Sequence, residues 1–445
     1  MRVHRLFITV HILVLADQGL SSPTWIINYD GVGTNTIKCV LPLSNGHTVF
    51  SATCYSPPDI SGSWTAEIDE NGDILWNYYN DYPPLGIAEI NGEGCILLTG
   101  TANSCRVVRL DQSGNEIWEH PAAWTLAGIV GTADGNFVYR NVGNLIKIDK
   151  DFNTIWTLEP PEPGVIQILG PSYSPSGGFA AAGANPGSFS DTVAAGTADS
   201  LGVFGSVGYI TGGGGIITAL SAYSDVDESC YGVVQYLNPM PPNLSDEIVF
   251  RFNAGGELNW SREIDDMVAL CRSTDGHPVV VGEETPDYPV TFFIRKLDPG
   301  NGDTIWSVVH GNGDDSFVPY CIATASDGGF IVGGGCSEGT AVLAKTDSEG
   351  LINGMGIEED LVHGPLHVSP VSNPSGSSVL LRIQAPESSG LSLVIHDSCG
   401  RVVFSQSMGT GMGIVNAGTL PTGMYTASIL SDEHGIASCR LVVLN

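Results

Sequence analysis

Short runs of alternating apolar and polar residues fill most of the chain, and a recurring polar turn separates them. The clearest copy is Leu297–Trp306, LDPGNGDTIW, which reads as a strand end, a tight turn and a new strand that carries a Trp. Weaker copies lie at Ile68–Trp76, Leu110–Trp118, Ile148–Trp156 and Phe252–Trp260, and a copy without the Trp lies at Thr346–Ile352. Alternation of period two on both sides of each turn predicts β-strands rather than helices.

A second series of turns alternates with the first, and each of these is a Gly turn followed by an apolar strand. Asn-Gly and Asp-Gly pairs between β-prone runs are strong hairpin cues, because Gly tolerates the positive φ of the turn. The turn glycines are Gly46, Gly94, Gly135, Gly177, Gly276 and Gly328. Their spacing is 41 to 52 residues, except for one gap of 99 residues that predicts a degenerate unit near Tyr209–Val234.

This periodicity and a change of composition after residue 352 predict the domain organisation. Repeats of 40–50 residues with several strands each are typical of propeller blades, so we predict an all-β fold with a seven-bladed β-propeller over residues 23–352. Residues 353–368 have no strand periodicity and are expected to form a linker. Several alternating strands in residues 369–445 predict a small C-terminal immunoglobulin-like β-sandwich.

Two side chains recur at fixed places in the repeat. The Trp after the turn is expected to fill the wedge between blades, with sugar stacking by one or two copies as the alternative. A basic residue stands two positions before the turn Asp or Asn in five copies, and Glu67 takes that place in the first copy. Because such positions share one strand face, we predict that each base pairs with the acid of that same turn. The five bases are Arg109, Lys147, Arg251, Lys296 and Lys345.

The N-terminal residues predict export. Arg2 and Arg5 precede an apolar run, Leu6–Ala16, and small or polar residues follow to Ser22. This order is typical of a secretory signal peptide, predicted over residues 1–22, and the alternative is a buried first strand. The run is too short to span a membrane, and no later segment reaches the roughly 18 apolar residues that a span needs, so we expect no transmembrane segment in the mature chain.

The net charge of −31, with only five Lys, bears on the partners. A surface this acidic repels phosphate backbones and anionic lipids. We therefore expect no binding to nucleic acid or to membrane surfaces.

The ten cysteines are candidates for disulfides if the chain is exported. Cys39 and Cys54 flank one Gly turn, and Cys321 and Cys336 flank another with the same spacing of 15 residues. This shared register predicts two cross-strand disulfides, Cys39–Cys54 and Cys321–Cys336, with a third at Cys399–Cys439. No C-x-x-C pair occurs in the sequence, which argues against a zinc ribbon or a thioredoxin-like site.

Two of the acidic turns are candidate calcium sites. Hard oxygen ligands on a short loop suit Ca²⁺. The alternative is a hairpin turn in which the carboxylates accept hydrogen bonds from the backbone and no metal is needed. We expect no other cofactor. The candidate ligands are Asp69, Asn71, Asp73, Asp298, Asn301 and Asp303.

The repeats, including D-x-x-G-x-x-x-W and the ASDGGFIVGG stretch, resemble secreted bacterial β-propellers with pyrroloquinoline-quinone-like repeats. Many dehydrogenases of that superfamily use a vicinal disulfide at the quinone, and this chain has no adjacent Cys pair. The resemblance therefore implies the fold and not the quinone chemistry.

The tail resembles the C-terminal sorting domain of type IX (Por) secretion cargo. The matching features are Asn373-Pro374, the strand-turn Leu393–Val403 and the final apolar strand. The chain departs from that family because Arg440 is the only basic residue near its end. The resemblance implies delivery by secretion machinery to the outer face of a bacterial outer membrane or to the medium.

These observations favour an exported, non-catalytic β-propeller at the cell surface or outside the cell that binds a glycan or a protein. No catalytic motif is present in its required context, so no catalytic residue is predicted. The alternative is an extracellular polysaccharide-active enzyme, a glycoside hydrolase or lyase, with its site at a mouth of the propeller channel. Two carboxylates with Arg, His or Tyr at such a mouth would favour the enzyme.

Overall fold

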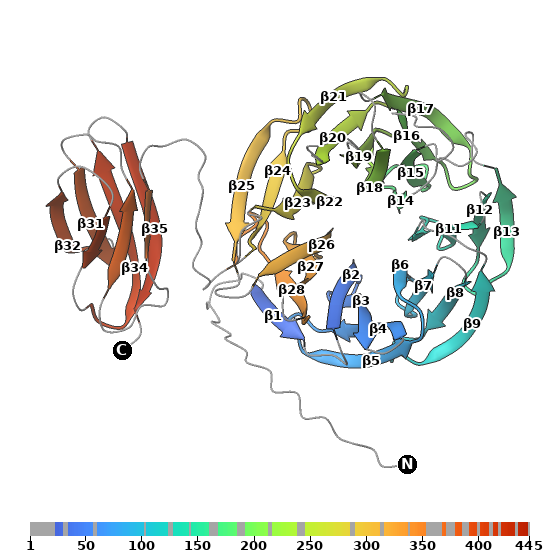
Figure 1. Ribbon diagram of the computed structural model, residues 1–445, viewed down its shortest axis with the longest axis horizontal. Coiled ribbons are helices and arrows are strands. Elements are labelled where there is room, and N and C mark those ends of the chain that lie inside the picture. Colours follow the sequence, from blue (N-terminus) through green and yellow to red (C-terminus); the bar gives the residue numbers. More distant parts are fainter. Residues whose placement is uncertain are drawn as a thin grey trace, which may run out of the picture. The chain divides into compact units, whose positions relative to one another are not determined.

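The computed structural model shows a chain of antiparallel strands, most of which form sheets of four (Figure 1). It describes residues 23–29, 34–56, 60–101, 104–122, 128–141, 144–159, 168–184, 192–211, 216–237, 245–284, 290–311, 316–336, 339–352, 367–370, 379–384, 391–397, 401–408, 413–416, 420–431 and 435–443. Within these ranges there is no helix, and so none that is long and apolar enough to cross a membrane. The predicted signal peptide and most of the predicted linker lie outside the described residues.

The described residues divide into two compact units. Those within Met1–Ile305 and Gly311–Gly350 form the first, and those within Trp306–His310 and Leu351–Asn445 form the second.

Seven sheets of four strands follow one another along the described chain up to Lys345, and we number them sheets 1 to 7. Sheet 1 contains β2 (Thr34–Pro42), β3 (Thr48–Ser56), β4 (Ile60–Ile68) and β5 (Ile74–Asn80). Sheet 2 contains β6 (Pro84–Glu89), β7 (Cys95–Thr101), β8 (Ser104–Leu110) and β9 (Glu116–Ala122). Sheet 3 contains β10 (Ile129–Gly131), β11 (Phe137–Asn141), β12 (Asn144–Ile148) and β13 (Thr154–Leu158).

Sheets 4 to 6 are built in the same way. Sheet 4 contains β14 (Ile168–Pro171), β15 (Phe179–Ala184), β16 (Thr192–Ala198) and β17 (Phe204–Thr211). Sheet 5 contains β18 (Ile216–Ser224), β19 (Cys230–Leu237), β20 (Ser245–Phe252) and β21 (Leu258–Glu263). Sheet 6 contains β22 (Met267–Arg272), β23 (Pro278–Glu283), β24 (Phe292–Leu297) and β25 (Thr304–His310).

Sheet 7 combines strands from distant parts of the chain. It contains β26 (Phe317–Thr324), β27 (Phe330–Cys336) and β28 (Ala341–Lys345), and its fourth strand is β1 (Trp25–Tyr29). The register of β1 against β28 runs from Trp25 opposite Lys345 to Tyr29 opposite Ala341. The sheets follow a ring in which the first strand of each sheet is innermost, and β1 is the outermost strand of sheet 7 (Figure 1). The fold of this unit is therefore β-propeller-like.

The core lies between neighbouring sheets, because each sheet has side chains on both faces. Tyr29 and Leu343 of sheet 7 pack in one buried cluster with Phe50 and Trp64 of sheet 1. Other buried clusters join sheets 1 and 2, sheets 2 and 3, sheets 3 and 4, and sheets 4 and 5. Burial against both neighbours explains why central strands such as β7 are buried almost throughout.

The recurrent Trp lies between sheets, as the sequence predicts. The indole N–H of Trp260 in sheet 5 donates to the carbonyl of Pro299 in sheet 6, at 2.9 Å. Trp156 in sheet 3 donates in the same way to Ser200 in sheet 4, at 3.4 Å. Each ring thus meets the outer turn of the next sheet, and the wedge-filling prediction is confirmed for these residues.

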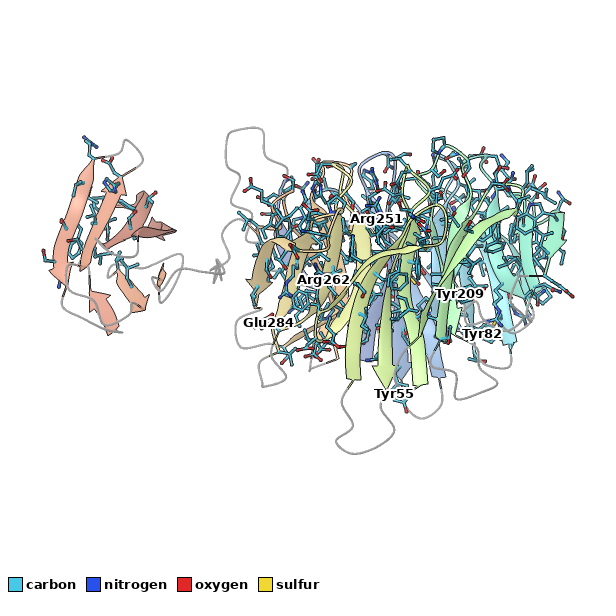
Figure 2. All side chains as sticks on the ribbon, turned by 90° about the horizontal axis from the view of Figure 1, so that it is seen from above. Tyr55, Tyr82, Tyr209, Arg251, Arg262 and Glu284 are labelled. Atoms are coloured by element: carbon cyan, nitrogen blue, oxygen red, sulfur yellow. The ribbon has the colours of Figure 1, made fainter. Side chains whose placement is uncertain are left out.

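We call the turn between the first and second strands of a sheet its inner turn, and the turn between the third and fourth strands its outer turn. Both kinds of turn lie on one rim of the ring, which we call the turn rim. Figure 2 shows the ring edge-on, with Arg251 toward this rim and Tyr55 toward the opposite one. The turn missing from the Gly series spans Asp225–Ser229, and Glu228 adopts the positive φ there, at 63°.

The predicted partner of the recurrent base is wrong. Lys147 pairs with Asp134 of the inner turn, at 2.7 Å, and not with Asp149 of its own outer turn. Four other bases also pair with an inner-turn acid: Arg109 with Glu93, Arg251 with Asp227, Lys296 with Asp275 and Lys345 with Asp327. Strand alternation predicts which face of the strand carries the base. It does not predict which turn supplies the acid, because the inner and outer turns of a sheet lie on the same rim. The outer-turn Asp149 is already used, because its carboxylate accepts backbone N–H groups of that turn.

The second unit contains the C-terminal strands. One sheet has the order β29 (His367–Pro370), β30 (Leu380–Gln384), β33 (Gly413–Asn416), and the other has the order β32 (Val402–Met408), β31 (Leu391–Asp397), β34 (Gly423–Ser431), β35 (Gly435–Val443). Its buried side chains include Leu381, Leu393, Ile395 and Ala427.

Candidate functional site

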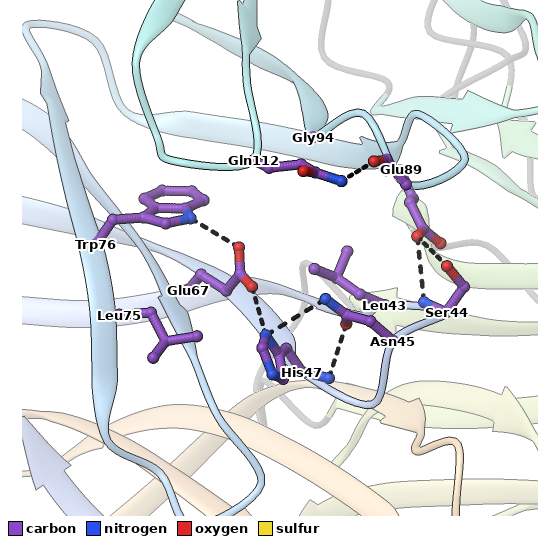
Figure 3. A pocket seen from close by; sticks show the side chains of 11 residues that line it. Leu43, Ser44, Asn45, His47, Glu67, Leu75, Trp76, Glu89, Gly94 and Gln112 are labelled. Atoms are coloured by element: carbon purple, nitrogen blue, oxygen red, sulfur yellow. Dashed lines mark hydrogen bonds and ion pairs between the residues drawn. The ribbon is translucent and has the colours of Figure 1, made fainter.

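A pocket of about 320 Å³ opens at the turn rim between sheets 1 and 2 (Figure 3). The inner turn of sheet 1, the end of β4 and the start of β5 line one side. The end of β6 and two turns of sheet 2 line the other. The lining residues are Leu43, Ser44, Asn45, His47, Glu67, Leu75, Trp76, Glu89, Gly92, Gly94 and Gln112.

Glu67 is the buried acid of this pocket, with 8% of its side chain exposed. Its Oε1 lies 2.6 Å from Nδ1 of His47, and its Oε2 accepts a hydrogen bond from the Trp76 indole at 2.7 Å. Glu67 and Trp76 lie directly opposite each other in the β4–β5 register, next to a β-bulge. Both carboxylate oxygens are therefore occupied, as burial of a charge requires.

His47 is more exposed, at 34% of its side chain, and follows a tight turn. Its backbone N–H donates to the Asn45 side chain at 3.0 Å, and Gly46 supplies the positive φ of 91°. A contact of 2.6 Å to a carboxylate requires a proton between the two atoms. With that proton on Nδ1, Nε2 faces away from Glu67 and has no partner within the described residues. It accepts a hydrogen bond when the ring is neutral and donates one when the ring is protonated.

Glu89 forms the opposite wall. It is the last residue of the innermost strand β6, and its Oε1 accepts hydrogen bonds from the N–H and hydroxyl of Ser44, at 3.1 and 2.7 Å. Its Oε2 has no hydrogen-bond partner among the residues that the structure describes. Gln112 closes this side by donating to the Gly92 carbonyl.

The sequence contains one signal for this site, a departure from the repeat pattern in sheet 1. Glu67 stands at the place where five other repeats carry a base. His47 stands close to the place where those repeats carry the acid of the inner turn, so in sheet 1 the strand carries the acid and the turn carries the basic side chain. This exchange places an acid and an imidazole together beside Leu75 and Trp76. The sequence pattern alone does not predict the pocket, because six separate strands and turns contribute to it.

The candidate calcium ligands lie in two outer turns. Asp69 Oδ1 accepts the N–H groups of Asn71 and Asp73, both at 2.9 Å, as in the turn-capping alternative. In the other turn Asp298 Oδ1 accepts the N–H of Gly300, at 2.7 Å. Across the described ranges no group of three His, Cys, Asp or Glu side chains is placed to hold a metal ion.

Asp303 in the second turn has side-chain partners of its own. Its Oδ2 accepts a hydrogen bond from the Asn301 amide at 2.7 Å, and its Oδ1 accepts one from Arg262 of the preceding sheet at 3.0 Å. The carboxylates of Asp69, Asp298 and Asp303 are thus used in hydrogen bonds within the protein.

The predicted cysteine pairs of the propeller-like unit are wrong. The structure shows Cys39, Cys54, Cys321 and Cys336 in the reduced form, and neither predicted pair is bonded. In the β2–β3 register Cys39 lies opposite Ser51 and Cys54 lies opposite Asn35, and in sheet 7 the two cysteines are displaced in the same way. Equal distances from a turn do not place two residues opposite each other when the hairpin includes a β-bulge. Cys399 and the side chain of Cys439 lie outside the described residues.

No protein-family model matches the chain, and no curated protein matches it. Among solved structures, virginiamycin B lyase from Staphylococcus aureus, in selenomethionine-substituted form, is 10% identical with a TM-score of 0.51, over 73% of this chain and 99% of that chain. The Pan2 WD40 domain of Neurospora crassa is 11% identical with a TM-score of 0.47, over 69% and 88%. The extracellular domain of BT4673 from B. thetaiotaomicron is 10% identical with a TM-score of 0.41, over 97% and 62%.

The likeness to the lyase concerns the fold alone at this identity. It agrees with the repeated four-stranded sheets, and the chain is a β-propeller-like repeat protein.

Proposed function

We propose that the chain is a closed seven-bladed β-propeller followed by a small immunoglobulin-like sandwich. Each of sheets 1 to 7 is one blade, and β1 closes the ring by completing the last blade. The two C-terminal sheets are the layers of the sandwich. A hydrogen bond of 2.7 Å from the Tyr425 hydroxyl to the Pro421 carbonyl supports this, because tyrosine corners of such sandwiches bond back to the backbone in this way.

The protein is exported and acts at the cell surface or outside the cell. Residues 1–22 are its signal peptide. Residues 353–366 are a linker, two residues shorter than the sequence predicts because β29 begins at His367, and residues 367–445 are a type IX-like sorting domain that engages secretion machinery. The basic, then apolar, order of the N-terminus and the resemblance of the tail support this proposal.

Its function is to bind a glycan in the pocket between sheets 1 and 2, without catalysis. One observation carries this proposal. The pocket presents two polar atoms that have no partner among the residues the structure describes, Glu89 Oε2 and His47 Nε2, beside the apolar side chains of Leu43, Leu75 and Trp76. A sugar offers hydroxyl donors on its edge and an apolar C–H face, so it can use both parts of this lining.

The experiment is a glycan and protein binding screen on residues 23–445, with and without calcium, followed by titration of the best ligand. Glu89→Gln keeps the shape of the wall and removes its charge, and we expect affinity to fall roughly tenfold to a hundredfold, as for a lost charged hydrogen bond. Glu70→Gln is the matched control, because it lies in a turn outside the pocket and its backbone carbonyl still binds Trp25. Equal affinity of both variants for every ligand found would rule out this pocket as the site.

Calcium binding by the two acidic turns stays a prediction, and the calcium arm of the same screen tests it. A rise in melting temperature with calcium that is lost in Asp69→Asn would support it.

One observation favours the alternative of a polysaccharide-active enzyme. The pocket holds two carboxylates, Glu67 and Glu89, together with His47, which is the combination of side chains expected of the enzyme. An imidazole whose Nδ1 lies against a buried carboxylate is oriented for general-base catalysis through Nε2. Release of shortened or unsaturated products from a bound polysaccharide in the same screen would establish the enzyme in place of the binding protein.

A further inference from the structure

The innermost strands carry a small residue at the same place in all seven sheets. Each inner turn begins at a residue whose carbonyl accepts the turn N–H, and the small residue lies four positions before it. In chain order these residues are Cys39, Gly86, Gly128, Gly170, Ser221, Ala269 and Cys321. The only two thiols in this set belong to sheets 1 and 7, which meet at the seam where β1 completes sheet 7.

Small residues at this place lie against the next sheet. A Cβ added to Gly86 would lie 3.0 Å from Cα of Gly128, and one added to Gly170 would meet the Ala222 carbonyl. Ser221 reaches sheet 6 in the same way, because its hydroxyl donates to the Leu270 carbonyl at 3.3 Å. The position in one sheet therefore contacts the corresponding position, or its neighbour, in the next.

At the seam between sheets 7 and 1, the corresponding positions are both cysteines, Cys321 and Cys39. Lys38 and Tyr320 are the bulge residues that precede the two cysteines, and the ammonium of Lys38 lies 3.2 Å from the centroid of the Tyr320 ring. A Cβ added to Gly333 would lie 2.8 Å from the Cys321 sulfur and 3.0 Å from the side chain of Val40. The Cys321 thiol and the side chain of Val40, the residue that follows Cys39, therefore lie beside the same glycine at the seam, and the two thiols are close enough to affect each other electrostatically.

We propose that Cys39 and Cys321 form a disulfide across this seam and covalently close the ring. In the reaction one thiolate attacks a disulfide oxidant such as oxidised glutathione and releases one glutathione thiol. The second cysteine then displaces the other, so the two cysteines lose two electrons and two protons and the oxidant is reduced to two thiols. The proposal concerns ring closure and is independent of the ligand.

The bond is expected to form during folding. Burial raises the pKa of Cys39 to about 12 and that of Cys321 further, which leaves little thiolate once the seam is packed. The nearby Lys38 ammonium opposes this effect on both thiols.

The test is to refold the reduced, denatured full chain in a mixture of reduced and oxidised glutathione and to map its peptides without reduction. We expect a peptide pair that joins Cys39 to Cys321 and disappears on reduction, and a melting temperature several degrees above that of the reduced chain. Absence of this pair in the folded chain, or pairing of either cysteine with Cys54 or Cys336, would overturn the proposal.

Three variants complete the test. Cys39→Ser and Cys321→Ser each remove one partner, and Ser221 and Ala269 at the corresponding places show that the fold accepts small side chains there. Both variants should lose the peptide pair and the gain in melting temperature. Cys230→Ser is the control in a buried strand of sheet 5 and should keep both. A gain that survives Cys321→Ser would show that the seam does not cause it.

Discussion

At the scale of single residues, one buried base connects its own strand with two turns, one in its own sheet and one in the next. Lys147, with only 1% of its surface exposed, donates to Asp134 of its own sheet and to the carbonyl of Ser200 in the next sheet. A buried ammonium is tolerated only when it is paired in this way. The sequence pattern predicts that the base recurs, but it cannot give its partner, because Asp134 lies on another turn of the same sheet.

Substitution of Asp134 tests this ion pair through its pH dependence. Burial alone would raise its pKa, but hydrogen bonds from Lys147 and Thr132 lower that pKa from 3.8 to about 2. A folded-state pKa below the unfolded one gives stability that is present above about pH 4 and lost as pH falls toward 2. In Asp134→Asn this acid-labile part, about 1 kcal/mol after solvent screening, should be absent.

Urea unfolding at pH 7 and at pH 2.5 measures the effect. At pH 7 the variant should be less stable by about 1–3 kcal/mol, because Lys147 keeps only the carbonyl partner. Asp151→Asn is the control: this exposed acid binds Arg109, which keeps Glu93, so the loss should stay below about 0.5 kcal/mol. Equal losses in both variants would contradict the role given to Asp134.

At the scale of elements, each outermost strand is matched to the outer turn of the next sheet. Trp76 of sheet 1 lies on Gly114 of sheet 2, where an added Cβ would be 2.4 Å from its ring. Sheet 3 departs from the rule without breaking it: Phe152 takes the Gly place at a φ of 66°, and its ring lies 5.5 Å from Trp118. The place of the Trp in each repeat could be predicted from the sequence. Its contact with the outer turn of the next sheet could not, because that contact depends on how the sheets are arranged around the ring.

Gly114→Ala tests this contact between elements. Gly114 has a φ of 74°, so the variant combines backbone strain with a clash against Trp76. We expect a loss of about 2–4 kcal/mol in the free energy of unfolding, measured by urea titration. Gly92→Ala is matched in φ, at 75°, but has no atom within 4 Å of the added Cβ, so about 1 kcal/mol is expected. Similar losses in both would mean that backbone strain alone is responsible.

At the scale of the whole molecule, the sequence predicts what depends on local pattern. The two turn series indicated an all-β chain of repeated sheets, and the structure confirms this β-propeller-like character. Contacts between repeats could not be predicted in this way. The cysteine pairs were predicted wrongly because a bulge shifts the β2–β3 register. The pocket could not be predicted because Glu67 and Glu89 belong to different sheets.

Deletion of residues 367–445, which removes the C-terminal strands from β29 onward, tests whether the ring folds without them. If the tail is a separate sandwich, its apolar faces are buried against each other, and the ring does not need them. The truncated chain should then keep its melting temperature within a few degrees, measured by calorimetry, but should no longer reach the cell surface. A large fall in melting temperature would make the sandwich part of the core of the ring. Unchanged surface delivery would remove the sorting role.

The pairing of β1 with β28 brings together residues that are far apart in the covalent chain. Trp25 lies opposite Lys345, at the point where the outer turn of an ordinary sheet would lead directly into its fourth strand. A short peptide could therefore join Gly350 to the residue before Trp25, and the chain could be opened at any other outer turn. A circular permutant of this kind should build the same ring of sheets from a rearranged gene, because sheets of the same construction leave no preferred starting sheet.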